Sequence, residues 1–228
     1  MAHNRRRFAK EVDMDQLVEK ARAFAHAARA GSICKYTGRD MVSRHADIAN
    51  TLAVHRASPE VVAAGWLLDI HTDTGVPLGM IEHFFGPSVA MLVRDASHYG
   101  YENMSTANRA ERMAIERERI ADVCEEGHGD AVRTLKLAYL IVMTRLIVTC
   151  DARFAHTYMR EVRRVLGLLV GGHSGLFLLL ATQVENYFRT PVPDDSASGA
   201  PLANVGMLGS PGKYIQIVDT PVSPLSWH

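Results

Sequence analysis

The segment that most constrains the fold reads Trp66-Leu67-Leu68-Asp69-Ile70-His71-Thr72-Asp73-Thr74, and it directly follows an apolar run, Val61-Val62-Ala63-Ala64-Gly65. The apolar run predicts a buried helix. At its end stand two carboxylates, Asp69 and Asp73, with His71 between them. Because residues four apart share a helix face, we expect Asp69 and Asp73 to point the same way. Carboxylates at the end of a buried helix are typical of a pocket that carries chemistry.

The composition favours one large globular domain. The chain has 228 residues, and 47% of them are hydrophobic, which allows a sizeable core. Lys plus Arg number 25 and Asp plus Glu number 25, so the formal net charge is zero and we expect no nucleic-acid partner. The 3 cysteines form no Cys-x-x-Cys pair, so we expect neither a disulfide framework nor a zinc site. Since no apolar segment resembles a signal peptide or a membrane span, we expect a cytoplasmic protein.

Helical periodicity predicts an all-α body, a bundle of about eight helices. Ser58-Pro59 is a strong helix start, and we expect that helix to continue to about His71. Residues 130–148 are nearly all apolar and predict a central, buried helix, whereas 106–126 predict a charged helix with a solvated face laced with i,i+4 pairs. From Thr190 onward Pro, Gly, Ser and Asp dominate, so we expect a helical domain, 1–189, and an irregular tail, 190–228.

Several segments in a fixed order carry a resemblance to a known family. They are Lys35-Tyr36-Thr37-Gly38, Ala63 to Thr74, Phe85-Gly86-Pro87 and Leu135-Lys136-Leu137-Ala138. With them, residues 15–185 resemble the HD-domain phosphohydrolases, in particular the bacterial SpoT-like hydrolases of guanosine tetra- and pentaphosphate (ppGpp). The resemblance implies an HD-domain fold and a metal ion, usually manganese, held by two histidines and two aspartates.

The metal ligands of that family do not carry over to this chain. At the four ligand positions stand Arg44, Leu68, Asp69 and Tyr139, so only Asp69 is kept. Leucine has no donor atom for a metal, and a guanidinium is permanently positive. We therefore expect no metal and no cofactor. An alternative set, His45 with Asp69, His71 and Asp73, offers enough donors, but His45 and His71 fall on other helix faces than the family's ligands.

The residues around the lost metal position have changed as well. The family's glutamate-aspartate pair, which positions the attacking water, corresponds to Thr72 and Asp73, and its nucleotide-contacting asparagine corresponds to Met143. Of the phosphate-facing residues, Lys35 is kept. Arg44 suggests a replacement for the metal: its guanidinium could extend into the vacated position and pair with Asp69, which would otherwise be a costly buried charge.

These substitutions predict a degenerate HD-domain protein that has lost metal-dependent ppGpp hydrolysis and uses the old cavity in another way. One use is to bind a small molecule, with a ligand site formed by Lys35, Arg44, Leu68, His71, Thr72 and Met143. Another is metal-free acid-base chemistry, with Asp69 or Asp73 as general base and Tyr139 as proton donor. A residual manganese-dependent pyrophosphohydrolase and a non-catalytic regulatory or interaction protein are the alternatives. We expect a small-molecule ligand and no membrane partner, and a homodimer is compatible with this interpretation.

Overall fold

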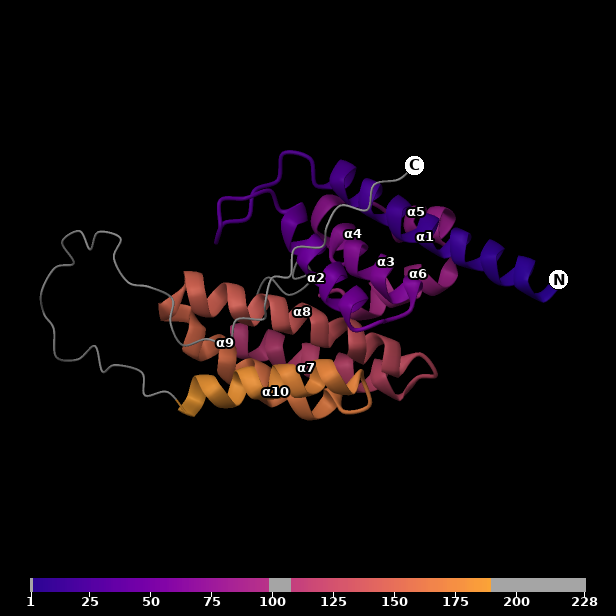
Figure 1. Ribbon diagram of the computed structural model, residues 1–228. Coiled ribbons are helices and arrows are strands. Elements are labelled where there is room, and N and C mark those ends of the chain that lie inside the picture. Colours follow the sequence, from indigo (N-terminus) through magenta and orange to yellow (C-terminus); the bar gives the residue numbers. More distant parts are fainter. Residues whose placement is uncertain (1, 99–107, 190–228) are drawn as a thin grey trace, which may run out of the picture. The chain divides into compact units, whose positions relative to one another are not determined.

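The computed structural model describes residues 2–98 and 108–189, with side chains from residue 15 onward (Figure 1). Within these residues every regular element is a helix, which confirms the all-α prediction, and Ile33 and Asp40 form an isolated antiparallel bridge. The helices are α1 (Ala2–Ala28), α2 (Val42–Val54), α3 (Pro59–Leu67), α4 (Ile70–Thr74), α5 (Leu78–Phe85), α6 (Pro87–Ala96), α7 (Arg109–Glu125), α8 (Gly129–Cys150), α9 (Ala152–Val165), the 3-10 helix η2 (Leu166–Leu169) and α10 (Ser174–Arg189).

Local sequence signals explain most helix boundaries. Ser58 precedes α3 in extended conformation and Pro59 occupies its first turn, although the Ser58 side chain makes no capping hydrogen bond. Asn108 and Glu111 form a reciprocal capping box at the start of α7. Gly86, at φ 84°, ends α5 and precedes the proline that begins α6. Each signal lies within a few residues of the boundary it sets.

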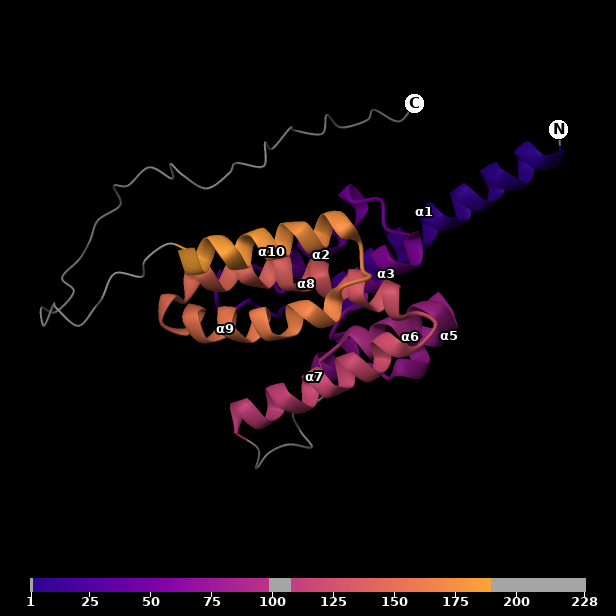
Figure 2. The same ribbon diagram turned by 90° about the horizontal axis from the view of Figure 1, so that it is seen from below.

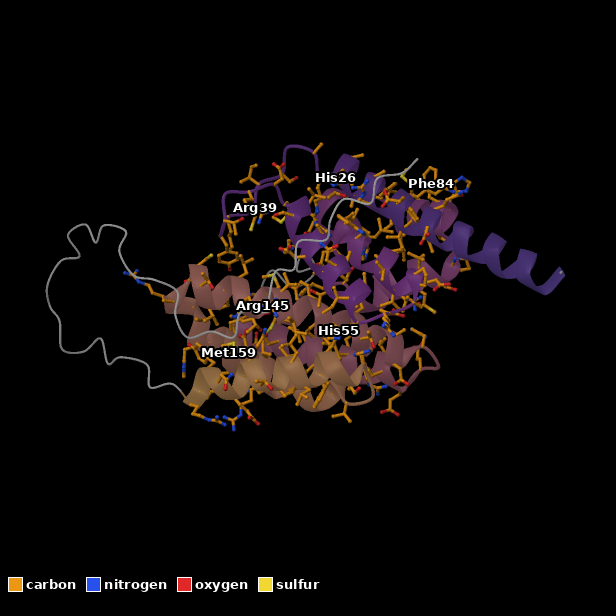
Figure 3. All side chains as sticks on the ribbon, in the orientation of Figure 1. His26, Arg39, His55, Phe84, Arg145 and Met159 are labelled. Atoms are coloured by element: carbon orange, nitrogen blue, oxygen red, sulfur yellow. The ribbon has the colours of Figure 1, made fainter. Side chains whose placement is uncertain are left out.

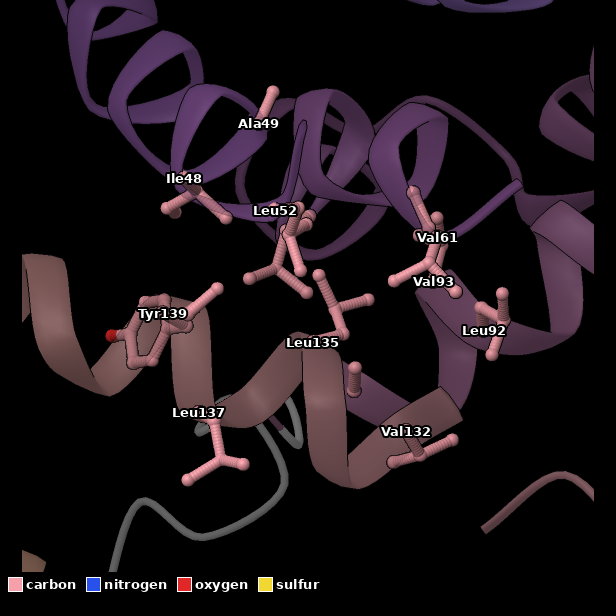
Figure 4. Close-up of a cluster of buried hydrophobic side chains, with 14 of the residues drawn as sticks. Ile48, Ala49, Leu52, Val61, Leu92, Val93, Val132, Leu135, Leu137 and Tyr139 are labelled. Carbon is pink, nitrogen blue, oxygen red and sulfur yellow. The ribbon is translucent and has the colours of Figure 1, made fainter. Parts of the chain in front are cut away.

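The central helix of the core is α8, as its apolar sequence predicts. It packs against α2, α3 and α6 on one side and against α7, α9 and α10 on the other (Figures 1 and 2). Leu135, Leu137 and Ile141 on this helix are completely buried. Figure 4 shows Leu135 and Tyr139 of α8 on the side that faces Ile48 and Leu52 of α2. The helix that carries Tyr139 is thereby fixed against the α2–α3 layer.

The helix expected from Ser58 to His71 is broken at Asp69, so that prediction is wrong. α3 ends at Leu67, Leu68 has an extended ψ of 136°, and Asp69 has the left-handed φ of 58°. A non-glycine residue in this region costs roughly 1–2 kcal/mol, although aspartate tolerates it better than most residues. α4 then begins at Ile70. Asp69 and Asp73 are therefore not two positions of one helix face, although the Asp73 amide still donates to the Asp69 carbonyl at 3.0 Å.

Two other expectations stay predictions. On α7 the expected i,i+4 pairs stay a prediction, while Arg119 and Glu116 form an ion pair three residues apart. The tail, 190–228, lies outside the described residues, so its irregular character stays a prediction. None of the described helices is both long and apolar enough to cross a membrane.

The junction of α7 and α8 makes a specific stability prediction. A Cβ at the buried Gly129 would overlap the backbone of Cys124, whereas a Cβ at Gly127, two residues earlier, would meet open space. We expect Gly129→Ala to lower the free energy of unfolding by about 1–3 kcal/mol, as overpacking typically does. Gly127→Ala is the matched control and should change it little. Urea denaturation of both variants tests this, and equal effects would contradict the assigned packing.

Candidate functional site

Asp69 is held in place by the end of α6. Its Oδ1 accepts a hydrogen bond from the His98 backbone N–H at 2.9 Å and lies 3.4 Å from His98 Nδ1. Its own N–H donates to Ser97 Oγ at 2.9 Å. Burial acts to raise the pKa of Asp69, but the charge and hydrogen bonds of His98 and the charge of Arg44 outweigh it and hold that pKa well below its usual range. Asp69 is therefore a buried, ionised carboxylate.

Arg29, just after the end of α1, is the second fixed point of the site. Its side chain is 5% exposed. Nη2 donates to Asp73 Oδ2 at 2.7 Å and to the Asp69 carbonyl oxygen at 3.3 Å, while Nε donates to His45 Nε2 at 3.2 Å. One guanidinium thus ties α1, α2 and the α3–α4 break together. No local signal in the sequence distinguishes this arginine from the others.

Arg44 does not form the direct ion pair with Asp69 that we expected. Among the described carboxylates, its ion-pair partner is Asp73, with Nη2 to Oδ2 at 4.0 Å. The position beside Asp69 is taken by His98, which the sequence analysis did not select, while Arg44 acts on Asp69 only through space. Arg44 Nε is buried and has no hydrogen-bond partner within the described part of the chain. The site therefore contains a largely buried guanidinium with unused hydrogen-bonding capacity.

The two histidines of the alternative metal set, His45 and His71, are both held in the neutral form, and each has a buried Nδ1 without a hydrogen-bond partner among the described residues. His45 is buried, and burial together with the charges of Arg44 and Arg29 lowers its pKa to about 3. Its Nε2 accepts from Arg29 and so faces a cation rather than a free position. Burial also lowers the pKa of the half-buried His71, although the charges of Asp69 and Asp73 act in the opposite direction.

The remaining predicted site residues fall into three groups. Thr72 lies beside Asp69, because its Oγ1 donates to the Asp69 carbonyl at 3.1 Å, and the Tyr139 ring packs edge-on against the His98 ring with 5.0 Å between centroids. Leu68 and Met143 are buried and apolar. Lys35 differs: it is exposed on the loop before α2, with Nζ 4.8 Å from the centroid of the Tyr36 ring. The structure thus brings Thr72 and Tyr139 to the Asp69 centre and leaves Lys35 at the surface.

A second buried ion cluster supports the same end of α6. Arg119 donates to the carbonyl oxygens of Asp95 and Ser97 at 2.9 and 2.6 Å, and it pairs with Glu116 at 3.0 Å. Lys136 Nζ lies 2.9 Å from the same Glu116 carboxylate. Burial acts to raise the pKa of Glu116, but Lys136 and Arg119 lower it to about 2. These charges fix the backbone that presents Ser97 and His98 to Asp69.

The donor set around Asp69 does not fit the manganese ion that the family implies. The carboxylate accepts from His98, the charge of Arg44 acts on it through space, and the neighbouring residue Leu68 is buried and has no donor atom for a metal. Among the described residues, three side chains do bring possible metal-ligand atoms close together, but they lie away from Asp69. They are Asp95, Glu126 and His128. There Arg94 binds both Asp95 oxygens at 2.6 and 2.8 Å, which makes that group an ion-pair cluster rather than an open site.

A hollow of about 470 Å³ lies elsewhere on the domain, between the end of α1 and the loop before α2. Its lining includes His26 and Arg39, both labelled in Figure 3, together with Asp40 and Ser43. None of the predicted site residues lines it. The hollow therefore provides no support for the roles assigned to Asp69, Asp73 or Tyr139.

Comparison with known proteins identifies the domain. Residues 21–124 match the model of the HD domain. The chain contains an HD domain. A solved structure of a metazoan ortholog of SpoT, which hydrolyses ppGpp and plays a role in starvation responses, superposes with a TM-score of 0.64 at 19% sequence identity and covers 75% of this chain and 95% of the other. No curated protein matches the sequence. The matched model confirms the HD-domain resemblance that the sequence predicts, and the solved structure shows that the fold is shared.

His45 gives the HD domain a testable pH dependence. The unfolded state takes up a proton on His45 near pH 6.5, whereas the folded state does so only near pH 3. The unfolded state binds more protons between these values, so His45 lowers stability as pH falls, by about 1.4 kcal/mol per pH unit. We expect the wild-type chain to lose roughly 2 kcal/mol more than His45→Gln between pH 6.5 and pH 5. The exposed His83→Gln is the control, and equal losses in wild type and His45→Gln would contradict the burial of a neutral His45.

Proposed function

We propose that this HD-domain protein has lost manganese-dependent hydrolysis of ppGpp and that the former active site binds a small anionic molecule without turning it over. The observation that carries the proposal is Arg44, the arginine at a metal-ligand position, whose buried Nε has no hydrogen-bond partner among the described residues. A buried donor without a partner costs about 1–3 kcal/mol. A carboxylate or phosphate of a ligand would satisfy it.

Tyr158 on α9 supports the same ligand chemistry. Its hydroxyl is buried and also without a hydrogen-bond partner in the described part of the chain. Burial, and then the nearby charge of Glu161, raise the pKa of Tyr158, while the charges of Arg109 and Arg44 act against this rise. The hydroxyl therefore stays protonated near neutral pH and can donate. Arg44 and Tyr158, from α2 and α9, would both donate to one anionic group.

Metal-free catalysis with Asp69 as general base has weaker support. An efficient general base has a pKa near the working pH, whereas the pKa of Asp69 is held well below its usual range. Asp73 is engaged by Arg29 at 2.7 Å. We therefore favour binding without turnover, and with it a sensor or regulatory role; a cytoplasmic location stays an expectation from the sequence.

Replacing Arg44 and replacing Arg29, the two arginines beside Asp73, should have different effects on the stability of the folded chain. Arg44→Met removes a buried charge that has an unused donor, so we expect the ligand-free chain to be as stable as wild type or about 1 kcal/mol more stable. Arg29→Met leaves the buried His45 Nε2 and the Asp69 carbonyl without their donor and should cost about 1–3 kcal/mol. Chemical denaturation of both variants measures this. A large loss of stability in Arg44→Met would show that Arg44 is structural.

Ligand binding can be tested with pyrophosphate, GMP and ppGpp in metal-free buffer. At 100 times the dissociation constant, a bound anion should stabilise the folded chain by about 2.7 kcal/mol. We expect thermal stabilisation in wild type and in the surface control Arg22→Gln, and its loss in Arg44→Gln. Equal stabilisation of Arg44→Gln and wild type, or none by any of these anions, would count against an anion site at Arg44.

The loss of hydrolysis is a separate prediction. We expect no release of pyrophosphate from ppGpp above the uncatalysed level when manganese is added to the purified chain, because Arg44, Leu68 and Tyr139 stand at three of the four ligand positions that the resemblance implies. Phosphate and nucleotide analysis by ion-exchange chromatography measures this. Manganese-dependent turnover that disappears in Asp69→Asn would establish the residual hydrolase instead.

A further inference from the structure

The exposed face of α9 carries a stripe of arginines. Arg153, Arg160 and Arg164 follow one another at intervals of seven and four residues, and Arg163 lies further round the helix, 5.4 Å from the centroid of the Phe188 ring of α10. At 100° per residue, the first three fall within about 40° of one another around the helix. All four are exposed, and none has an ion-pair partner among the described residues. Glu161, also on α9, is turned away and binds Arg109 at 2.7 Å.

The exposed face of α7 carries the opposite charge in the same spacing. Glu111, Glu118 and Asp122 also follow one another at intervals of seven and four residues, and Glu125 extends the stripe by one turn. All four are exposed, and Glu118, Asp122 and Glu125 have no ion-pair partner within residues 15–98 and 108–189. Ile115, at 41% exposure, lies beside this stripe and adds an apolar contact.

Neither stripe is compensated within its own helix. Like charges one turn apart repel each other, so each stripe favours a partner of opposite charge. The two helices contact each other at Arg109, which binds Glu161 and lies 4.5 Å from the Phe154 ring centroid. Among the described residues, no ion pair joins a member of one stripe to a member of the other. The formal net charge of the chain is zero. The stripes therefore reflect where the positive and negative side chains lie, not an excess of one sign of charge.

We propose that the chain self-associates by placing α7 of one copy on α9 of another; Figure 2 shows both helices. A second copy is the occupant that fits both stripes at once, whereas a nucleic acid or an acidic peptide would satisfy α9 and leave α7 unpaired. When the two helices run parallel, the equal spacing aligns three ion pairs in register. These pairs are Glu111 with Arg153, Glu118 with Arg160, and Asp122 with Arg164.

Charge reversal on each stripe tests the proposal in the full chain. The α9 variant is Arg160→Glu with Arg164→Glu, and the α7 variant is Glu118→Arg with Asp122→Arg. Sedimentation at low salt should show self-association of wild type that weakens at least tenfold at 0.5 M NaCl, where the Debye length falls to about 4 Å. Each variant alone should be monomeric, because two of the three contacts then join like charges and only Glu111 with Arg153 stays an opposite-charge pair. An equimolar mixture should associate again, because every contact then joins opposite charges.

Two controls accompany the charge-reversal variants: a charge reversal outside both stripes and a measurement of folding. Glu82→Arg on α5 reverses an exposed charge outside both stripes and should associate as wild type does. Thermal unfolding of each variant shows whether it is folded, and folded variants that fail to associate when mixed would overturn the proposal. A wild-type chain that stays monomeric at low salt would also overturn it. If that monomer binds single-stranded RNA and the α9 variant does not, the arginine stripe serves nucleic acid instead.

Discussion

The Asp69 carboxylate is buried and charged, and the surrounding fold provides its compensation. An ionised carboxylate in a protein interior is tolerated when other groups donate to it and offset its charge. Here the His98 N–H donates to the carboxylate, and the Ser97 hydroxyl accepts from the Asp69 amide. These contacts join the end of α6 to the break between α3 and α4. The left-handed conformation of Asp69 is held by the same contacts.

Arg29 extends this arrangement to the rest of the domain. Its contacts with Asp73, His45 and the Asp69 carbonyl connect α1 and α2 to the same break. Together with the contacts of Ser97 and His98, they make the surroundings of Asp69 a network of protein groups. The consequence is that Arg44 is left with a buried, unpartnered Nε, and this unused capacity is why we assign binding rather than turnover.

Much of the fold could be predicted from local patterns, because helix starts, glycine stops and apolar periodicity act within a few residues. The central position of α8 follows from such patterns, and so does the choice of Asp69 as a candidate site residue. The break at Asp69 could not be predicted in this way, since an apolar segment followed by charged residues contains no local signal that ends the helix at Leu67. Its cause is tertiary: Ser97 and His98, 28 and 29 residues away, hold Asp69 in a conformation that interrupts the helix. Arg29 and His98 were missed for the same reason, because nothing adjacent to them in sequence marks their partners.

The most direct test of a protein network in place of a metal is a manganese titration of the full chain followed by electron paramagnetic resonance. The signal of free hydrated manganese reports the unbound ion. If the groups around Asp69 replace the metal, the signal should equal that of buffer at every protein concentration up to the millimolar range, and Asp69→Asn should behave as wild type does. A loss of the free-ion signal equivalent to one manganese per chain, which Asp69→Asn abolishes, would contradict the replacement of the metal by protein groups.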